Sequence, residues 1–439
     1  MIARLRYILR LAVAFASRFK VLLLSGILLG IASFFLLGLI FPSKSREKIG
    51  ITGRYTPTTL PTSILGMVGQ GLTRLEEDGN VVPDLASSWE TTDKGKTWTF
   101  YLKGGASWQD GKPVTSSGIS YAFSDVEITR PDAQTIIFKL QNPYSAFPSI
   151  VSRPTFKTGL LGSGEWKVKN LSLAGSFVDE ITISHPKKGI KIYRFYPTEE
   201  QTKLAFKLGK IDNIEGIFDP KPIDSWPLLN ETKEVETGGY VAVFLNTTND
   251  KLADKSLRQA LAYAVDKETL GGTRAIGPIS VDSWAFNPQV KPYDYDPKKA
   301  KSMIDEIKDA QNTEVLTVNL NATPTLLSQA ESIKKNWEEA GLVVNLVVAG
   351  TIPNDFEALL AIFDTPEDPD QYSMWHSTQI STNITRYSNP RIDKLLEDGR
   401  TEINKETRKQ IYFDFQRYLV EDSPAVFLFY PTTYNIERK

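Results

Sequence analysis

Apolar and polar residues alternate most clearly between residues 97 and 103. Trp98, Phe100 and Leu102 fall on one face of this run, and threonine, tyrosine and lysine residues fall on the other, as a half-buried β-strand requires. Turn sequences, including an Asp-Gly pair at 78–79, lie upstream of it and are strong hairpin signals. The pattern predicts a compact β-rich region, followed by a short helical segment at 117–123.

Strand and helix patterns alternate in much of the remaining chain. Residues 190–195 alternate as a strand, and 197–208 have helical spacing with Thr198 as the N-cap. The same strand, helix, strand order recurs between residues 315 and 348. This order is typical of a parallel α/β sheet.

A second strong helical pattern covers residues 254–268, where leucine and alanine form one apolar stripe. A short apolar strand, 240–246, comes before it and follows a pair of glycines. Glycines at that place can absorb backbone rotation between two lobes. We expect Arg258 and Asp266 of the helix to serve packing and capping salt links rather than catalysis.

The N-terminal residues differ from the rest. Residues 21–41 are an apolar run without a charge or a proline, which is long enough to cross a hydrocarbon core of about 30 Å. Arginine and lysine residues precede it without any acid, so the N-terminus should stay in the cytoplasm. A cleaved signal peptide is the alternative, but the run ends in Leu-Ile-Phe-Pro rather than in small residues. The pattern therefore favours a permanent membrane anchor.

Composition narrows the classes of function. A chain of 439 residues that is 41% hydrophobic can form two lobes with large cores. It has no cysteine and two histidines, which excludes disulfides, thiolate metal sites and a multi-histidine metal site. Residues 1–48 carry a net charge of +7, so the total of −1 leaves −8 for the remainder. A mildly acidic main body lacks the basic surface that nucleic-acid binding needs.

Several segments together resemble one family, the extracytoplasmic solute-binding proteins of ABC importers, in their peptide, oligopeptide and nickel branch (family 5). The similar segments occur in the family's order: 71–123, 142–147, 254–268, 383–396, 408–416 and 421–430. The resemblance implies an α/β fold, a two-lobed periplasmic-binding-protein-like clamp of type II. Because residues 124–135 hold no run of helices, the accessory subdomain should be reduced.

The resemblance also implies a domain order. We expect a cytoplasmic basic segment (1–20), a transmembrane anchor (21–41), a linker (42–48), lobe I with a shortened accessory subdomain at about 75–160 (49–239), lobe II (240–424) and a C-terminal return to lobe I (425–439). The chain crossings near Gly239 and Val426 would act as hinges.

The most promising place for a ligand is the stretch 360–372, where an apolar strand runs into an acidic loop. Such a strand edge can pair with an extended peptide while an acid receives its ammonium group. The resemblance places peptide contacts at Ala361, Ile362, Phe363 and Asp368. The family's ammonium acceptor corresponds to Thr365, so Asp364 either takes this role after a loop shift or the ammonium site is absent.

Other ligand-binding candidates follow from the cleft that the resemblance implies. They are Thr58 and Thr59 in the loop after the first strand, Tyr240 in the crossing strand, and Trp375 beside the acidic loop. Plain loop polarity for the threonines and packing for the aromatic residues are the alternatives.

These features predict a membrane-anchored binding protein that captures peptides or similar small solutes outside the cell. The resemblance implies a monomer that needs no cofactor and delivers the solute to the permease and ATPase subunits of an ABC importer at the cytoplasmic membrane. A membrane-anchored peptide receptor or scaffold without transport is the alternative. A hydrolase is a third reading, but acids four residues apart in a proline-containing loop have no defined catalytic geometry.

Overall fold

The computed structural model describes residues 18–20, 25–26, 45–351, 353 and 355–439. Among them, no helix has the length and apolarity that a membrane crossing needs. The predicted anchor at 21–41 lies outside the described residues, apart from 25 and 26.

The first lobe is built on a seven-stranded sheet with the order β12-β19-β11-β1-β10-β9-β8. Its central strand, β1, is parallel to both neighbours, β10 and β11. The strands are β1 (Arg46–Thr52), β8 (Lys167–Ala174), β9 (Phe177–His185), β10 (Gly189–Tyr196), β11 (Asn213–Ile217), β12 (Leu229–Val235) and β19 (Thr432–Arg438).

Two helices pack on this lobe. α5 (Glu199–Lys207) connects β10 to β11, and the Oγ1 of its N-cap Thr198 accepts from the Gln201 amide, as the sequence predicts. α3 (Thr62–Val68) follows β1 and buries Ile64 and Val68. The predicted strand, helix, strand unit corresponds to β10, α5 and β11 and is confirmed.

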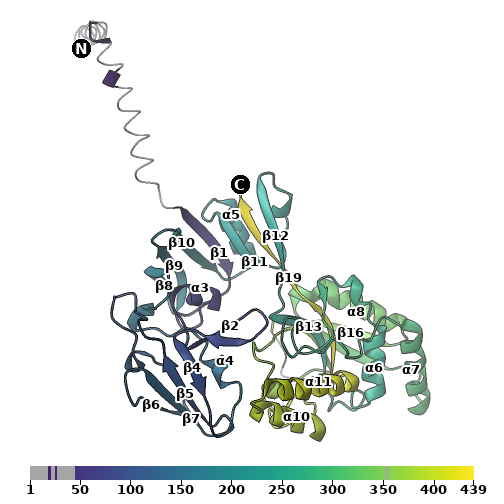
Figure 1. The fold of residues 1–439 in the computed structure, drawn as a ribbon. Coiled ribbons are helices and arrows are strands. Elements are labelled where there is room, and N and C mark those ends of the chain that lie inside the picture. Colours follow the sequence, from purple (N-terminus) through teal and green to yellow (C-terminus); the bar gives the residue numbers. More distant parts are fainter. Residues whose placement is uncertain (1–17, 21–24, 27–44, 352, 354) are drawn as a thin grey trace.

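An accessory subdomain extends from the first lobe and lies at the lower left of Figure 1. Its antiparallel sheet has the order β4-β5-β7-β6, with β4 (Ala86–Glu90), β5 (Thr97–Leu102), β6 (Val126–Thr129) and β7 (Thr135–Leu140). The hairpin of β2 (Thr73–Leu75) and β3 (Val81–Pro83) precedes it. Trp98, Phe100 and Leu102 are all buried, which confirms the predicted alternation.

The predicted helix at 117–123 is wrong, because only a 3-10 turn forms at Ser116–Gly118. The following aromatic residues are drawn into the subdomain core instead. Tyr121 and Phe123 pack against Phe138, and the Tyr121 hydroxyl donates to the Val151 carbonyl.

The second lobe contains a six-stranded sheet with the order β14-β18-β13-β17-β15-β16. Its strands are β13 (Gly239–Leu245), β14 (Thr273–Arg274), β15 (Thr317–Ala322), β16 (Val343–Val348), β17 (Ala358–Asp364) and β18 (Ala425–Tyr430). The helices around it are α6 (Lys255–Ala264), α7 (Pro297–Ala310), α8 (Leu327–Glu339), α9 (Tyr372–Trp375), α10 (Pro390–Thr401) and α11 (Lys405–Asp422). All seven residues of β13 are buried, so this strand forms the centre of the core.

The chain crosses between the lobes at two adjacent points. Residues 236–238 connect β12 of the first sheet to β13 of the second, and Pro431 connects β18 to β19. The Glu236 amide donates to the Pro431 carbonyl (2.8 Å), so the crossings lie side by side. Figure 1 shows β19, in yellow, running from the second lobe into the first.

The predicted C-terminal return, at 425–439, needs a correction. β18 pairs with β13 inside the second lobe, and β19 is the strand that joins the first sheet. The reason is that all six residues of β18 are apolar or aromatic and buried, so both faces of this strand pack inside the second lobe. The return therefore begins after Tyr430.

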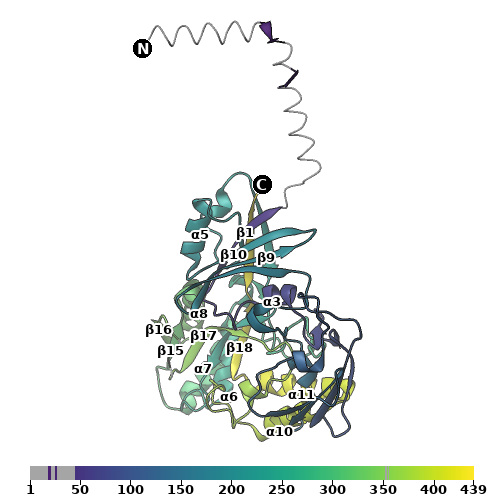
Figure 2. The ribbon, with the colours of Figure 1, turned by 90° about the vertical axis from the view of Figure 1, so that its left-hand side faces the viewer.

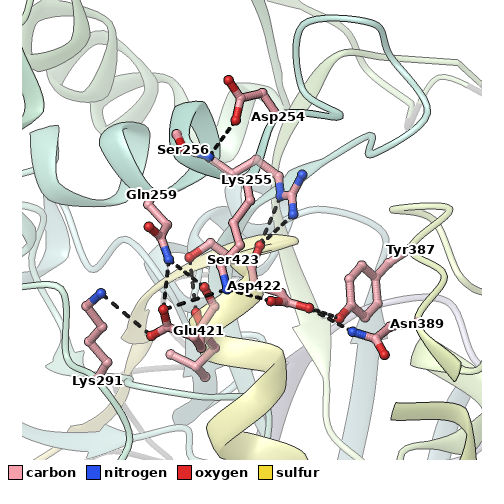
Figure 3. Close-up of polar contacts among 12 residues, drawn as sticks. Asp254, Lys255, Ser256, Gln259, Lys291, Tyr387, Asn389, Glu421, Asp422 and Ser423 are labelled. Carbon is pink, nitrogen blue, oxygen red and sulfur yellow. Dashed lines mark hydrogen bonds and ion pairs between the residues drawn. The ribbon is translucent and has the colours of Figure 1, made fainter. Parts of the chain in front are cut away.

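Figure 3 shows a polar cluster where the end of α11 meets the start of α6. The Asp422 carboxylate accepts hydrogen bonds from the Tyr387 hydroxyl (2.6 Å) and the Asn389 amide (2.9 Å), and it lies 2.8 Å from Lys255 Nζ. Arg258 donates to the Asp422 main-chain carbonyl (2.8 and 3.0 Å) and to the Leu252 carbonyl (2.8 Å). Arg258 is thus buried by packing, as predicted, but it donates to main-chain carbonyls and makes no salt link to an acid of the described chain.

Candidate functional site

The lobes face each other beside the two crossings. The loop after β17, residues 365–371, forms the wall on the second lobe, and the β2–β3 hairpin of the first lobe lies opposite. A cavity of about 360 Å³ lies between this hairpin and Thr237, Gly238 and Gln371. A second cavity, of about 520 Å³, is lined by the hairpin, α3 and the segment 149–154. Both cavities share Leu75, Thr365 and Glu367, and we call them together the cleft.

The strand that leads into the loop has an open edge near the cleft. β13 pairs with β17 along its whole length, whereas β15 pairs only with Ala358–Leu360. Within the described part of the sheet, Ala361–Asp364 therefore have no ladder partner on the β15 side. Main-chain groups in such a position can pair with an extended chain, whatever its side chains are.

The acids of this loop differ in their ionic partners. Asp368 makes a two-pronged ion pair with Arg408 (2.9 and 2.5 Å), and Asp370 lies 3.2 Å from Arg400 Nε. Burial raises the pKa of Asp370, although Arg400 opposes this. Glu367 is exposed and has no ion-pair partner among the described residues. It is thus the loop acid that is open to an incoming cation.

The opposite wall of the larger cavity carries two arginines. Arg74 and Arg153 of the first lobe line the larger cavity together with Glu367 of the second. The side chain of Arg74 is half exposed, 3.6 Å from Glu76, and Arg153 is exposed without an ion pair to any described residue. The larger cavity therefore has arginines on the first lobe and an acid without an ion-pair partner on the second, whereas the smaller cavity has Glu76 and Glu77 on the first lobe.

The predicted residues Asp364 and Phe363 line neither cavity, and Phe363 is partly buried against the core of the second lobe. Asp364 is exposed and paired in the ladder with Gly239 at the crossing. Phe363 packs against Tyr240, with ring centroids 5.7 Å apart. Thr365, which corresponds to the family's acid, donates its amide and its hydroxyl to the Gly238 carbonyl (2.8 and 2.9 Å), so it ties the loop to the crossing.

Other predicted residues do not line the cleft cavities. Tyr240 and Trp375 are fully buried in the core of the second lobe. The Tyr240 hydroxyl and the Trp375 indole N–H have no hydrogen-bond partner in the described chain. Thr58 and Thr59 are exposed, and their hydroxyls each lie 3.0 Å from the Thr56 hydroxyl. Neither threonine lines the two cavities.

Sequence reasoning missed Arg74, Arg153 and Glu367. Glu367 lies inside the acidic loop that the pattern indicated. It follows a proline and has no basic neighbour in sequence, and these two features could have drawn attention to it. The two arginines carry no local signal, because they reach the cleft only through the hairpin and the turn after α4 (Phe147–Ile150).

The sequence is similar to a known family model and to several binding proteins. Residues 80–126 and 188–382 match the sequence model of "Bacterial extracellular solute-binding proteins, family 5 Middle". The chain is similar to the probable D,D-dipeptide-binding periplasmic protein DdpA of Escherichia coli, with 25% identity over 82% of each chain. It is also similar to the oligopeptide-binding protein AppA of Bacillus subtilis, with 24% identity over 87% of this chain and 84% of that one.

Solved structures show the same fold. The substrate-binding protein CtaP from Listeria monocytogenes superposes with a TM-score of 0.75 at 21% identity, over 90% of this chain and 94% of the other. NikZ from Campylobacter jejuni, in complex with Ni(L-His), gives 0.72 at 23% identity over the same shares. The two-lobed α/β fold of periplasmic binding proteins is thereby confirmed. Since the family match covers more than half of its residues, the chain belongs to the family 5 bacterial extracellular solute-binding proteins, which are binding proteins and not enzymes.

Proposed function

We propose that this protein captures short peptides in the cleft, outside the cell, and delivers them to the permease and ATPase subunits of an ABC importer. The arrangement of charge carries this proposal, because Arg74 and Arg153 face Glu367 across one cavity. A peptide has a carboxylate at one end and an ammonium at the other, and each end would meet the opposite charge. Its main chain would pair with the open edge of β17 at Ala361–Asp364.

A ligand held in this way contacts both lobes. It therefore stabilises the closed arrangement, and a permease that distinguishes closed from open forms would receive only the loaded protein. The named ligands of relatives, which include dipeptides, oligopeptides and a nickel–histidine complex, define the solutes to compare.

The test is a thermal-shift and calorimetric screen of the full-length protein against di- to octapeptides, amino acids, sugars and nickel with histidine. We expect peptides to stabilise it, since a ligand at 100 times its dissociation constant adds about 2.7 kcal/mol. No stabilisation by any peptide would refute the proposal. Peptide binding without peptide uptake by cells would favour the receptor or scaffold alternative.

Glu367→Gln should weaken peptide binding about tenfold to a hundredfold, because a charge-assisted hydrogen bond is worth about 1.5–3 kcal/mol. Acetylating the peptide's amino group should weaken its binding to the wild type by the same factor. The same acetylation should weaken binding to Glu367→Gln little further. Asp364→Asn is the matched comparison, because Asp364 is the acid predicted from sequence. A loss confined to Asp364→Asn would assign the ammonium to Asp364, and retention in both variants would leave main-chain groups as the contacts.

We also propose that residues 21–41 anchor the protein in the cytoplasmic membrane with the N-terminus inside. The uncharged run and its basic flank support this. The full-length protein should stay in the pellet after alkaline carbonate extraction, and protease added outside should degrade its lobes. A protein released by carbonate, with a new N-terminus after residue 41, would show that the segment is cleaved.

A further inference from the structure

A separate cavity of about 450 Å³ lies between the accessory subdomain and the second lobe. Trp89 of β4, Trp98 of β5 and Trp284 of the second lobe contribute three indole rings to its walls, and Val81 and Ile403 also line it. Figure 2 shows α10 and α11 beside the accessory subdomain. Pockets of this size suit small ligands, and aromatic walls suit flat rings.

The charged groups at this cavity already have partners. Arg408 is paired with Asp368, and Lys405 donates to Asn80 and lies 5.1 Å from the centroid of the Trp284 ring. Glu402 accepts from the Asn404 amide (2.7 Å), and Glu90 accepts from the Tyr101 hydroxyl (2.6 Å). The Asp368–Arg408 pair is neutral as a whole, and the three indole rings offer a flat uncharged surface, so the site suits an uncharged flat group.

The tip of the β2–β3 hairpin separates this cavity from the cleft. The Trp284 amide donates to the Asp78 carbonyl (3.0 Å). A Cβ on Gly79 would lie 3.2 Å from the Glu367 carbonyl oxygen and 3.6 Å from Trp284 Cδ1, so the hairpin contacts the second lobe directly. Gly79 also lines the smaller cleft cavity, and Asp368 the larger, so the spaces adjoin.

We propose that this cavity binds an uncharged aromatic group. Because its walls come from both lobes, the bound group favours the same closed arrangement as a solute in the cleft, and the two would bind cooperatively. The group has two sources, a free aromatic molecule or an aromatic side chain of a peptide held in the cleft. The second source rests on the proposed function, whereas the first does not.

Val81→Trp tests the proposal by filling the cavity, and Val82→Trp is its control. Successive side chains of a strand point to opposite faces, and Val82 does not line the cavity. In the first arm, indole should raise the unfolding temperature of the full-length wild type and of Val82→Trp in a saturable way. Val81→Trp should bind indole at least about tenfold more weakly.

In the second arm, calorimetry compares Ala-Trp-Ala with Ala-Ala-Ala. Burial of the aromatic side chain should make the first peptide bind about tenfold or more tightly to the wild type, and this ratio should fall to about one in Val81→Trp. A positive indole arm identifies a free aromatic molecule, and a positive peptide arm identifies a side chain. If Val81→Trp matches the wild type in both arms, the proposal is overturned. If no peptide binds, the proposed function fails and the indole arm alone decides.

Discussion

Replacing Asp368 with alanine should lower the free energy of unfolding by about 3–5 kcal/mol, because it leaves a buried guanidinium without its counter-charge. Arg408 is 6% exposed, and its two terminal nitrogens contact the Asp368 carboxylate at 2.9 and 2.5 Å. Its Nε donates to the Gly399 carbonyl (2.8 Å), so the side chain cannot turn to solvent without breaking a further bond.

Urea denaturation of the full-length protein measures this loss. The exposed pair of Lys394 and Asp398 supplies the control, and Asp398→Ala should change stability by less than about 1 kcal/mol. Adding Arg408→Met to Asp368→Ala should recover at least half of the loss, since the unpaired charge is then gone. A loss below 1 kcal/mol for Asp368→Ala would mean that the pair is not the buried contact described here.

Asp422→Asn should cost about 1.5–3 kcal/mol at neutral pH, because the carboxylate receives charge-assisted bonds in the cluster of Figure 3. Burial alone would raise the pKa of Asp422, but Lys255, Tyr387 and Asn389 outweigh it and hold the pKa below its ordinary value. The unfolded chain then takes up the proton at a higher pH than the folded chain. The stabilisation is complete above the unfolded pKa of about 3.9 and is lost as the pH falls through the folded pKa.

The difference in stability between wild type and Asp422→Asn should therefore narrow below about pH 4. Chemical denaturation at a series of pH values measures it. Asp414→Asn, on the exposed side of α11 and paired with Arg417, should stay within about 0.5 kcal/mol of wild type. A gap between wild type and Asp422→Asn that is constant down to pH 2 would contradict this explanation.

Local patterns predicted much of the fold. The buried face of β5 and the cap of α5 follow from neighbouring residues alone, and these predictions are confirmed. The segment 117–123 has helical spacing, but its aromatic rings pack against strands that are distant in sequence. The C-terminal crossing was misplaced because 425–430 and 432–438 both have strand patterns, and only tertiary packing assigns each to its lobe.

The site was predictable only in part. The acidic loop after β17 was identified, but which of its acids is free depends on Arg400 and Arg408, which lie 30 and 40 residues after Asp370 and Asp368 in sequence. Arg74 enters the cleft through the β2–β3 hairpin and Arg153 through the turn after α4. Spacing in a sequence shows that acids are close together, whereas their ionic partners are set by tertiary structure.

The central claim is that a peptide binds between the lobes and holds them together. The chain has no cysteine, so spin labels at Lys169→Cys and Glu331→Cys, both exposed and one on each lobe, would be the only two. We expect a saturating tripeptide to narrow the distribution of distances between the labels and to shorten its mean, and we expect this to need more peptide in Glu367→Gln. A peptide that binds by calorimetry but leaves the distance distribution unchanged would contradict the claim.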